Sequence, residues 1–414
     1  MSTARPHVAI LGAGPTGLEA ALAAAERGLP FTLYEAAPEA AGHVRAWGHV
    51  RLFTPWDLNV SPRMSRHLEG AGHEVPRGAS CPTGHELADR LLAPLAALPA
   101  VAAGLCTGTR VRAVARQGLL KHQEIATPER GRRPFRLLLE DGTGREWTER
   151  ADVVIDATGT YGQPNSLGDG GIPAPGESAL GGPGAEEIRR HLPDFAREAG
   201  AWANRTILLA GAGHSAQTAA RALAELAREA PGTRVVWALR SAEPAWGTHD
   251  GDPLPERAAL AAAAAGLAAG ASPAIEARRG VAVERVCRLE GGLQVVLRDL
   301  EGANGGAEGA GEPLAVDRVL ALTGYVGDAG LYRQLQIHEC YATCGPMKLS
   351  AALLGAAGGD CLTQTSHGAD TLRNPEPGFF VLGIKSYGRN NTFLMRVGWQ
   401  QVDEVFGLLA PARA

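Results

Sequence analysis

Two stretches of this chain share a strand, glycine turn, helix, strand pattern, and this doubling restricts the fold more than any other feature. The second copy spans 204–241, with apolar strands expected at 207–210 and 235–239 around an alanine-rich helix. In such a βαβ unit the glycines allow a tight turn and a close backbone approach to a pyrophosphate at the helix N-terminus. The third small residue lets helix and strand pack closely. The turn of the second copy reads Gly211, Ala212, Gly213, His214, Ser215, Ala216.

The first copy spans 7–35 and carries the full three-glycine fingerprint. A strand at 8–11 leads into the turn, and a second strand at 31–34 ends at Glu35. An acidic residue at that place accepts hydrogen bonds from ribose hydroxyls, and it would repel a ribose 2′-phosphate. This copy therefore suits the adenosine of FAD or NAD. Its turn contains Gly12, Gly14, Pro15, Thr16 and Gly17.

The second copy ends differently, at Arg240 and Ser241. A guanidinium can pair with a phosphate through two parallel hydrogen bonds, and a serine can donate another. An arginine at this place accommodates the 2′-phosphate of NADP, so this half is predicted to prefer NADPH over NADH. A solvated surface arginine is the alternative interpretation.

Each copy is followed by strands and then by an apolar strand that ends in a Thr-Gly turn. These turns are Thr158-Gly159 and Thr323-Gly324. The repeated order predicts an α/β fold with two Rossmann-like, three-layer FAD/NAD(P)-binding domains, the second inserted into the first. The expected domains are an FAD-binding domain formed by 1–165 and 316–414 and an NADPH-binding domain formed by 166–315.

Composition excludes several classes of protein. The 414 residues are 45% hydrophobic and 20% charged, with a net charge of −4, so neither nucleic acid nor an anionic membrane is an expected partner. The N-terminus enters a core strand directly, and no apolar run reaches the ~20 residues needed to cross a bilayer. The six cysteines are scattered. We therefore expect a cytoplasmic protein.

Two loops are candidates for contact with a flat ring. The first, 51–59, offers Thr54, Trp56 and Asn59, although a surface loop that buries its own aromatic residues would look the same. The second follows an expected strand at 379–383 and precedes a helix at 392–409, a geometry that aims amide groups at an anion or a carbonyl oxygen. Its candidates are Gly383, Lys385, Ser386 and Arg389, of which the lysine and the arginine could equally face solvent.

The cysteines show no recognised catalytic or metal-binding spacing. Cys340 and Cys344 have CxxxC spacing, which matches neither the redox CxxC motif nor a zinc site. We expect both to be buried small residues. No metal site is predicted.

These motifs resemble those of flavoproteins with two dinucleotide-binding domains, and most closely those of the flavin-containing, single-component NADPH monooxygenases. The resemblance covers the framework of most of the chain through the two glycine turns, Glu35 and the two Thr-Gly turns. Two departures indicate an atypical branch. The FxGxxxH signature is absent from 162–206, and Gly383-Ile384-Lys385 stands where related reductases carry a Gly-Asp pair.

The resemblance implies that NADPH reduces FAD, and that the reduced flavin uses O₂ to oxygenate a soft nucleophile of a small molecule, an amine nitrogen or a sulfur. It implies a flavin edge lined by Asn59, Lys385 and Arg389, with Thr54, Trp56, Gly383 and Ser386 beside the cofactor. One rival is an NADPH-dependent flavin reductase or disulfide oxidoreductase using Cys340 and Cys344, with Cys81 as a further thiol. Another is a non-enzymatic flavin redox sensor, for which the sequence shows no DNA-binding element. The motifs do not fix the oligomeric state, and a homodimer is compatible with them.

Overall fold

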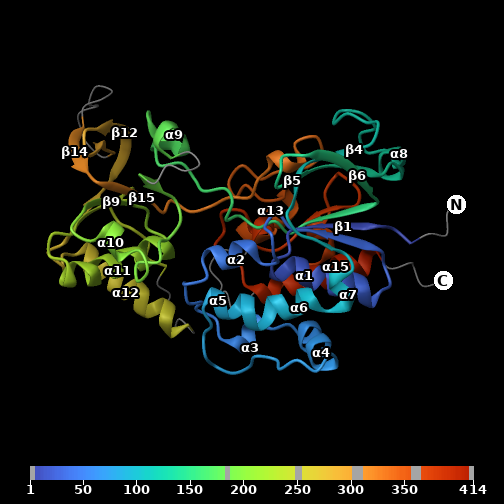
Figure 1. The fold of residues 1–414 in the computed structure, drawn as a ribbon. Coiled ribbons are helices and arrows are strands. Elements are labelled where there is room, and N and C mark those ends of the chain that lie inside the picture. The colour runs from blue at the N-terminus through green and yellow to red at the C-terminus, as the bar shows by residue number, and fades with distance from the viewer. Residues whose placement is uncertain (1–4, 182–186, 248–253, 301–310, 356–364, 410–414) are drawn as a thin grey trace. The chain divides into compact units, whose positions relative to one another are not determined.

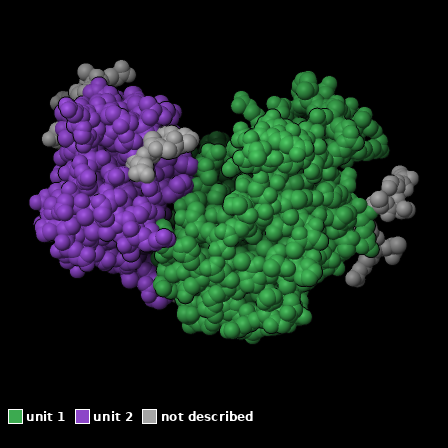
Figure 2. Space-filling view, in the orientation of Figure 1, with its two compact units in different colours: residues 1–163, 326–414 green, residues 164–325 purple. Residues whose placement is uncertain are grey.

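The structure is a computed structural model that describes residues 5–181, 187–247, 254–300, 311–355 and 365–409. The chain divides into two compact units, coloured separately in Figure 2. Unit 1 consists of residues 1–163 and 326–414, and unit 2 of residues 164–325. The second unit is therefore an uninterrupted insertion into the first, which confirms the predicted α/β fold with an inserted domain (Figure 1).

Unit 1 is built around a parallel sheet of five strands in the order β16-β7-β1-β2-β3. The central strand β1 pairs with β2 on one side and with β7 on the other. Strands buried on both faces read as continuous apolar runs, as β1 does with its sequence VAIL. The strand bounds are β1 (Val8–Leu11), β2 (Phe31–Tyr34), β3 (Leu105–Cys106), β7 (Val153–Asp156) and β16 (Phe379–Val381).

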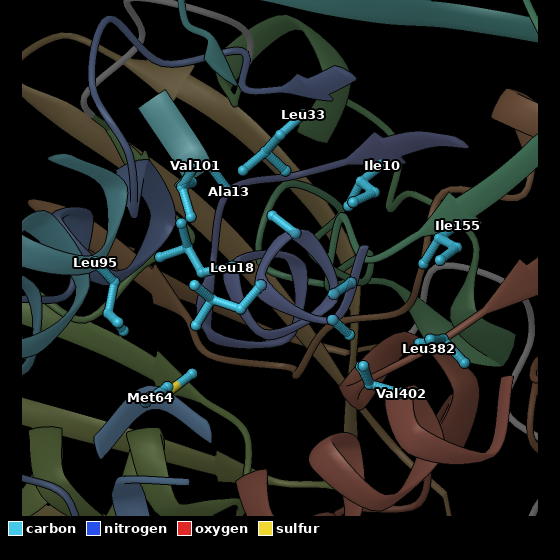
Figure 3. Packing of buried hydrophobic residues seen from close by; sticks show 14 of the residues in the cluster. Ile10, Ala13, Leu18, Leu33, Met64, Leu95, Val101, Ile155, Leu382 and Val402 are labelled. Carbon is cyan, nitrogen blue, oxygen red and sulfur yellow. The ribbon is translucent and has the colours of Figure 1, made fainter. Parts of the chain in front are cut away.

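The two faces of this sheet are covered by different layers. On one face Val8 and Ile10 pack in a cluster with residues of α1 (Pro15–Glu26), α4 (Pro62–Gly70) and α15 (Met395–Leu409). Figure 3 shows Ile10 in this cluster with Leu18 of α1 and Val402 of α15. On the other face Ala9 and Leu11 pack against an antiparallel three-stranded sheet. That sheet consists of β4 (Thr109–Arg116), β5 (Phe135–Asp141) and β6 (Glu146–Ala151).

Short helices complete unit 1, and the sequence signals explain where some of them begin. Thr83 precedes a stretch with helical spacing, which predicts that it is an N-cap, and it does cap α5 (Gly84–Leu87) through a capping box with Glu86. Most of the short helices come from two stretches: 36–72, whose lack of periodicity predicts a loop with short helical turns, and 83–99, whose spacing predicts a helix. The short helices are α2 (Gly42–Ala46), α3 (Trp56–Asn59), α5 (Gly84–Leu87), a π-helical turn (Ala88–Leu92), α6 (Ala93–Ala97), α7 (Pro99–Ala102), α8 (Pro128–Arg132), α13 (Met347–Gly355) and α14 (Ile384–Tyr387).

Unit 2 repeats the plan of unit 1. Its parallel sheet has the order β11-β10-β9-β15-β8, so β15-β9-β10-β11 matches β7-β1-β2-β3. A second antiparallel sheet, β12-β13-β14, packs its apolar residues against one face of it. The strands are β8 (Ile188–Arg189), β9 (Thr206–Ala210), β10 (Arg234–Leu239), β11 (Ile275–Arg279), β12 (Val281–Leu289), β13 (Gly292–Asp299), β14 (Glu312–Val316) and β15 (Arg318–Ala321). The helices are α9 (Glu177–Leu180), α10 (Ala199–Trp202), α11 (His214–Glu229) and α12 (Pro255–Ala268).

One boundary differs from the one expected from the sequence. Strand β15 pairs with β9 in the sheet of unit 2, whereas a boundary at 315 assigns it to the returning part of the first domain. The reason is that β15 is the equivalent of β7, and both strands close their own sheet before a Thr-Gly turn. The acidic, glycine-rich composition of 302–312 predicts a flexible loop tip, and this stretch lies mostly outside the described residues.

The two connections between the units run beside each other. Val326 donates its amide hydrogen to the carbonyl oxygen of Gln163 at 3.1 Å, and Asn165 donates to Gly324 at 2.9 Å. Across the described ranges no helix has the length and apolar character required to cross a bilayer.

Candidate functional site

The glycine turn of unit 1 contains glycines of two kinds. At Gly12 φ is +95°, and a methyl group there would lie 2.7 Å from the carbonyl oxygen of Ala157. A methyl group at Gly17 would overlap the carbonyl oxygen of Gly12. These two glycines are therefore required by the packing of the turn itself.

Gly14 differs because no protein atom lies within 4 Å of the place where its side chain would be. It is the N-cap residue of α1, with an ordinary extended backbone and no side-chain cap, and Pro15 follows it at the start of the helix. The first amide groups of a helix attract an anion. Open space over an uncapped helix N-terminus fits a pyrophosphate.

Unit 2 repeats this arrangement. At Gly211 φ is +120°, and a methyl group would overlap the carbonyl oxygen of Leu322 at the end of β15. Gly213 has no atom within 4 Å and stands as the N-cap of α11, again without a side-chain cap. His214 and Ser215 begin the helix, and buried Ala216 takes the place that Gly17 has in unit 1. Both predicted turns thus have a geometry that fits a dinucleotide.

Glu35 lies where the sequence places it, directly after β2. Its Oε2 accepts from the amide of Ala13 at 2.9 Å, and its Oε1 accepts from the amide of Ala37 at 2.9 Å. Each carboxylate oxygen can accept more than one hydrogen bond. The side chain is therefore held against the turn with acceptor capacity left for ribose hydroxyls.

Arg240 follows β10 and is 64% exposed, with Nη2 3.0 Å from Oδ1 of Asp169. Ser241 is engaged locally, because its hydroxyl donates to the carbonyl oxygen of Glu243 at 2.7 Å and accepts from the same residue's amide. Both residues are exposed, so a phosphate could reach either side chain in exchange for its present partner.

The two Thr-Gly turns anchor the ends of equivalent strands. The hydroxyl of Thr158 donates to Oδ1 of Asp156 at 2.7 Å, and Gly159 has a φ of +70°. In unit 2 the hydroxyl of Thr323 donates to the carbonyl oxygen of Asn165 at 2.8 Å, and Gly324 has a φ of +87°. Both turns need a glycine because the backbone there is left-handed.

Lys385 lies in the interior of unit 1, so the solvent-facing alternative for it is wrong. Its ammonium donates to Oδ2 of Asp156 at 2.5 Å, to the hydroxyl of Thr158 at 3.2 Å and to the carbonyl oxygen of Asp328 at 2.9 Å. The ring of Tyr332 lies 5.0 Å away. Because an ammonium has three donors, these partners leave none for a flavin carbonyl. The side chain positions the end of β7 instead.

The rest of the tail reaches the first glycine turn. Gly383 has a φ of +73°, and a methyl group there would lie 2.8 Å from the hydroxyl oxygen of Thr16 in α1. Its amide donates to Oε1 of Gln401 at 2.9 Å. Ser386 is buried, and its hydroxyl donates to the carbonyl oxygen of Gly383 at 2.7 Å. The segment expected as a polar turn is the short helix α14.

The candidates in 51–59 bind one another. Asn59 is buried; its Nδ2 donates to the carbonyl oxygen of Thr54 at 2.8 Å, and its Oδ1 accepts from the hydroxyl of Thr54 at 2.7 Å. Trp56 is 3% exposed and belongs to the hydrophobic cluster between the unit 1 sheet and its covering helices. A ring covered by protein on both faces cannot stack on a flavin, so the structure favours the alternative in which this loop buries its own aromatic residue.

Cys340, Cys344 and Arg389 meet in one turn. The amide of Cys344 donates to the carbonyl oxygen of Cys340 at 2.7 Å, and Nε of Arg389 lies 3.3 Å from Sγ of Cys344. Hydrogen bonds from the backbone and hydroxyl of Thr343 lower the pKa of the Cys340 thiol, with a smaller contribution from Ser350. Cys340 is 4% exposed, and both thiols are free.

Sequence reasoning missed three acceptors and one cation that organise these sites. Asp156 closes the run Ala-Asp-Val-Val-Ile-Asp, and a lone acid at the end of an apolar strand is a signal that could have identified it. The others lack such a signal, because they are brought together only by the fold: the carbonyl oxygen of Asp328, the carboxylate of Asp169 and the guanidinium of Arg298.

Comparison with known proteins identifies the fold. No family model matches the sequence, and no curated protein sequence matches it. Solved structures do match: the bacillithiol disulfide reductase of Bacillus cereus aligns with a TM-score of 0.66 at 17% identity, covering 98% of each chain. The ornithine N-hydroxylase of Kutzneria sp. 744, with reduced FAD, NADP⁺ and L-ornithine, aligns at 0.62 and 15%, covering 98% of this chain and 99% of that one. The FAD-bound cadaverine monooxygenase of Erwinia amylovora aligns at 0.62 and 14%, covering 100% of this chain and 97% of that one.

These neighbours include both disulfide reductases and N-hydroxylating monooxygenases, so they agree in architecture and differ in reaction. The chain has the two-domain FAD/NAD(P)-binding Rossmann-like fold that these flavoprotein oxidoreductases share.

Proposed function

We propose that this protein is an FAD- and NADPH-dependent monooxygenase that transfers one oxygen atom of O₂ to a nitrogen or sulfur nucleophile of a small molecule. The use of FAD and NADPH rests on the pair of open glycine turns whose second strands are followed by residues of opposite charge, and the choice of oxygenation rests on the points about amines and thiols given below. Glu35 in unit 1 suits an unphosphorylated ribose, and exposed Arg240 in unit 2 suits a 2′-phosphate.

The residues divide the binding of the cofactors between the units. In unit 1 the amide groups around Gly14 and the first turn of α1 would hold the FAD pyrophosphate, and Glu35 would accept from the adenosine ribose. In unit 2 the turn at Gly213 would hold the NADPH pyrophosphate, and Arg240 the 2′-phosphate. When bound, NADPH supplies a hydride, and FAD passes the electrons to O₂.

The protein's own task is to fix the groups around the flavin site. Lys385 ties β7, the Thr158 turn and the chain at Asp328 together through one buried ammonium. Gly383 brings the tail onto the first turn of α1. The difficult chemistry belongs to the cofactor, so no protein nucleophile is needed. Asn59, Lys385 and Ser386 agree with this, because their polar groups are engaged in hydrogen bonds within the protein.

An amine is the favoured substrate class. Two of the structural neighbours are named for hydroxylating ornithine and for monooxygenation of cadaverine, both small amines. The disulfide alternative depends on Cys340 and Cys344, and the burial of Cys340 leaves little thiol surface for a disulfide substrate. These points favour oxygenation and an amine nitrogen over a sulfur.

Two features of the cysteine turn favour the reductase alternative. The lowered pKa of Cys340 and the guanidinium of Arg389 beside Cys344 are features that activate thiols. The variants C340S and C344S separate the two functions. Oxygenation predicts unchanged NADPH-dependent turnover in both, and a disulfide reductase predicts loss of turnover in at least one.

The proposal is tested by measuring oxygen uptake by the FAD-loaded protein with NADPH across a panel of small amines and thiols. We expect one or a few amines to accelerate NADPH oxidation and to yield a product carrying oxygen from ¹⁸O₂, with little hydrogen peroxide. Conversion of all consumed O₂ to peroxide with every member of the panel, together with NADPH-dependent reduction of a disulfide, would contradict the proposed reaction.

A further inference from the structure

In unit 2 a single carboxylate bridges two arginines at the place expected to bind the 2′-phosphate. Oδ1 of Asp169 lies 3.0 Å from Nη2 of Arg240, and Oδ2 lies 2.5 Å from Nη2 of Arg298. Arg298 is also paired with Glu284 at 2.9 Å. The cluster therefore contains two cations and two anions and has no formal net charge.

The fold explains why these residues meet. Arg240 follows β10, whose last residue pairs with Arg279 at the end of β11, and β12 begins at Val281. Arg298 is opposite Ala282 at the start of β12. Asp169 belongs to the 3-10 turn Asp169–Gly171, which Gly168 places beside β12 through a bridge to Val283. All three side chains thus converge at the carboxyl end of β10.

We propose that Arg298 is a second guanidinium of the 2′-phosphate subsite, and that Asp169 is an internal anion which occupies this subsite and weakens NADPH binding. This inference rests on the proposed function, because it assigns the nucleotide selectivity of that same site. A carboxylate and a phosphate use the same hydrogen-bond donors of a guanidinium. With Asp169 in place, a 2′-phosphate would meet a like charge at the position where it needs a cation.

The turn that carries Asp169 is exposed and continues through two glycines, and Oδ1 of Asp169 also accepts from the amide of Gly170 at 2.7 Å. Gly170 and Gly171 follow it, with φ of +66° and +84° and with no protein atom within 4 Å of where a side chain would begin. Asp169 is 34% exposed and Arg298 is 30% exposed, so neither is locked in the core. Rotation of the turn would release both guanidiniums to a phosphate while Glu284 remained on Arg298.

The test uses the full-length, FAD-loaded protein and two nucleotides, adenosine 2′,5′-bisphosphate and 5′-AMP, whose binding is measured by calorimetry. D169N removes the competing charge and keeps the shape, and it should tighten binding of the bisphosphate about fivefold and leave 5′-AMP unchanged. R298Q should weaken the bisphosphate about tenfold, again without effect on 5′-AMP. R298K keeps the positive charge but not the planar guanidinium, so its affinity for the bisphosphate should lie between those of R298Q and the parent.

E225Q is the matched control, since it removes one negative charge from an exposed position of α11 in the same unit. It should change neither affinity. The FAD content and melting temperature of each variant show that it is folded.

The outcomes distinguish this inference from the proposed function. If D169N binds the bisphosphate no more tightly than the parent does, Asp169 does not compete with the phosphate. If R298Q binds the bisphosphate as tightly as the parent does, Arg298 is not part of the 2′-phosphate subsite. Either result overturns the inference, and NADPH use by the parent would still stand. A parent protein that binds neither nucleotide, or that prefers 5′-AMP, would overturn both.

Discussion

Gly14 and Gly17 stand three residues apart, yet the protein needs a glycine at these two positions for different reasons. A methyl group at Gly17 would overlap a backbone oxygen, so this glycine is required for the turn to form. A methyl group at Gly14 would meet no protein atom, and the backbone there is one that any residue adopts. Folding therefore does not require a glycine at position 14, and the space beside it is available to the pyrophosphate of the proposed FAD. The same reasoning applies to Gly213 in unit 2.

G14A should therefore separate binding from folding. We expect the FAD-free protein to keep its melting temperature, because the added methyl group contacts nothing, and FAD affinity to fall tenfold or more. G213A should instead raise the KM for NADPH and leave the FAD content unchanged. Fluorescence titration with FAD and steady-state kinetics with NADPH measure the two effects.

G407A is the matched control for this pair, because Gly407 in α15 also has no neighbour within 4 Å but belongs to neither glycine turn. It should be neutral or slightly stabilising, as expected for alanine in a helix. Equal FAD affinity in G14A and G407A would show that no pyrophosphate lies over Gly14.

Lys385 and Asp156 form a fully buried ion pair, and removing one member leaves a buried charge without its partner. K385M should therefore destabilise the protein by about 3–5 kcal/mol in chemical denaturation. The double variant K385M/D156L should recover part of this loss, because it removes both charges. D89N, which breaks the exposed pair with Arg45, should cost less than about 1 kcal/mol. A loss of under 1 kcal/mol in K385M would contradict the positioning role assigned to Lys385.

At the scale of elements, the helical layer of unit 1 is joined by charge as well as by packing. Arg63 on α4 contacts Glu19 at 2.5 Å and Glu26 at 2.8 Å on α1, and Asp403 at 2.6 Å on α15. Burial alone would raise the pKa of Glu26, but the hydrogen bonds and charge of Arg63, with Arg66 and His67, lower it to about 2. Burial has the larger effect at Glu19 and raises its pKa.

This network predicts a particular acid sensitivity. A carboxyl group whose pKa is depressed in the folded protein stabilises it fully above its ordinary value of 4.5 and loses that contribution as the pH falls toward about 2. Urea denaturation should therefore show that the free energy of unfolding of the parent falls between pH 7 and pH 2.5. The fall should be smaller in E26Q than in the parent, because E26Q lacks the titrating carboxyl group. E225Q should follow the parent curve. Parallel curves for E26Q and the parent would contradict the role of Glu26.

The sequence predicted those elements whose pattern is local, and it missed contacts that only the fold creates. The strand, glycine turn and helix of each copy were predictable because apolar runs, glycines and helix starts are neighbours in the chain. The sequence does not predict the buried position of Lys385, because nothing near it in the chain indicates that Asp156 is its partner. Trp56 was placed beside a flavin because a buried aromatic and a ligand-binding aromatic look alike without coordinates. The end of the inserted domain is predicted at 315, whereas the structure has it at Tyr325, because from sequence alone β15 could belong to the sheet of either domain.

At the scale of the whole molecule, unit 2 is a contiguous insertion whose ends meet. Gln163 and Val326 share a backbone hydrogen bond, and every strand of the unit 1 sheet comes from unit 1. Replacing 164–325 by a short glycine linker should therefore give a protein that folds and binds FAD but does not oxidise NADPH. Circular dichroism, FAD titration and NADPH assays check this. An insoluble or FAD-free product would show that unit 1 depends on its insertion.

The proposed function requires that FAD binds to unit 1 and NADPH to unit 2 of one chain. The most direct measurement is the visible spectrum of the purified protein loaded with FAD, recorded without oxygen before and after addition of NADPH. We expect a bound flavin that NADPH bleaches rapidly in the parent, a G14A protein that retains less flavin at the same FAD concentration, and a G213A protein that is yellow but bleaches slowly. A parent protein that takes up no flavin, or a bound flavin that NADPH does not reduce, would contradict it.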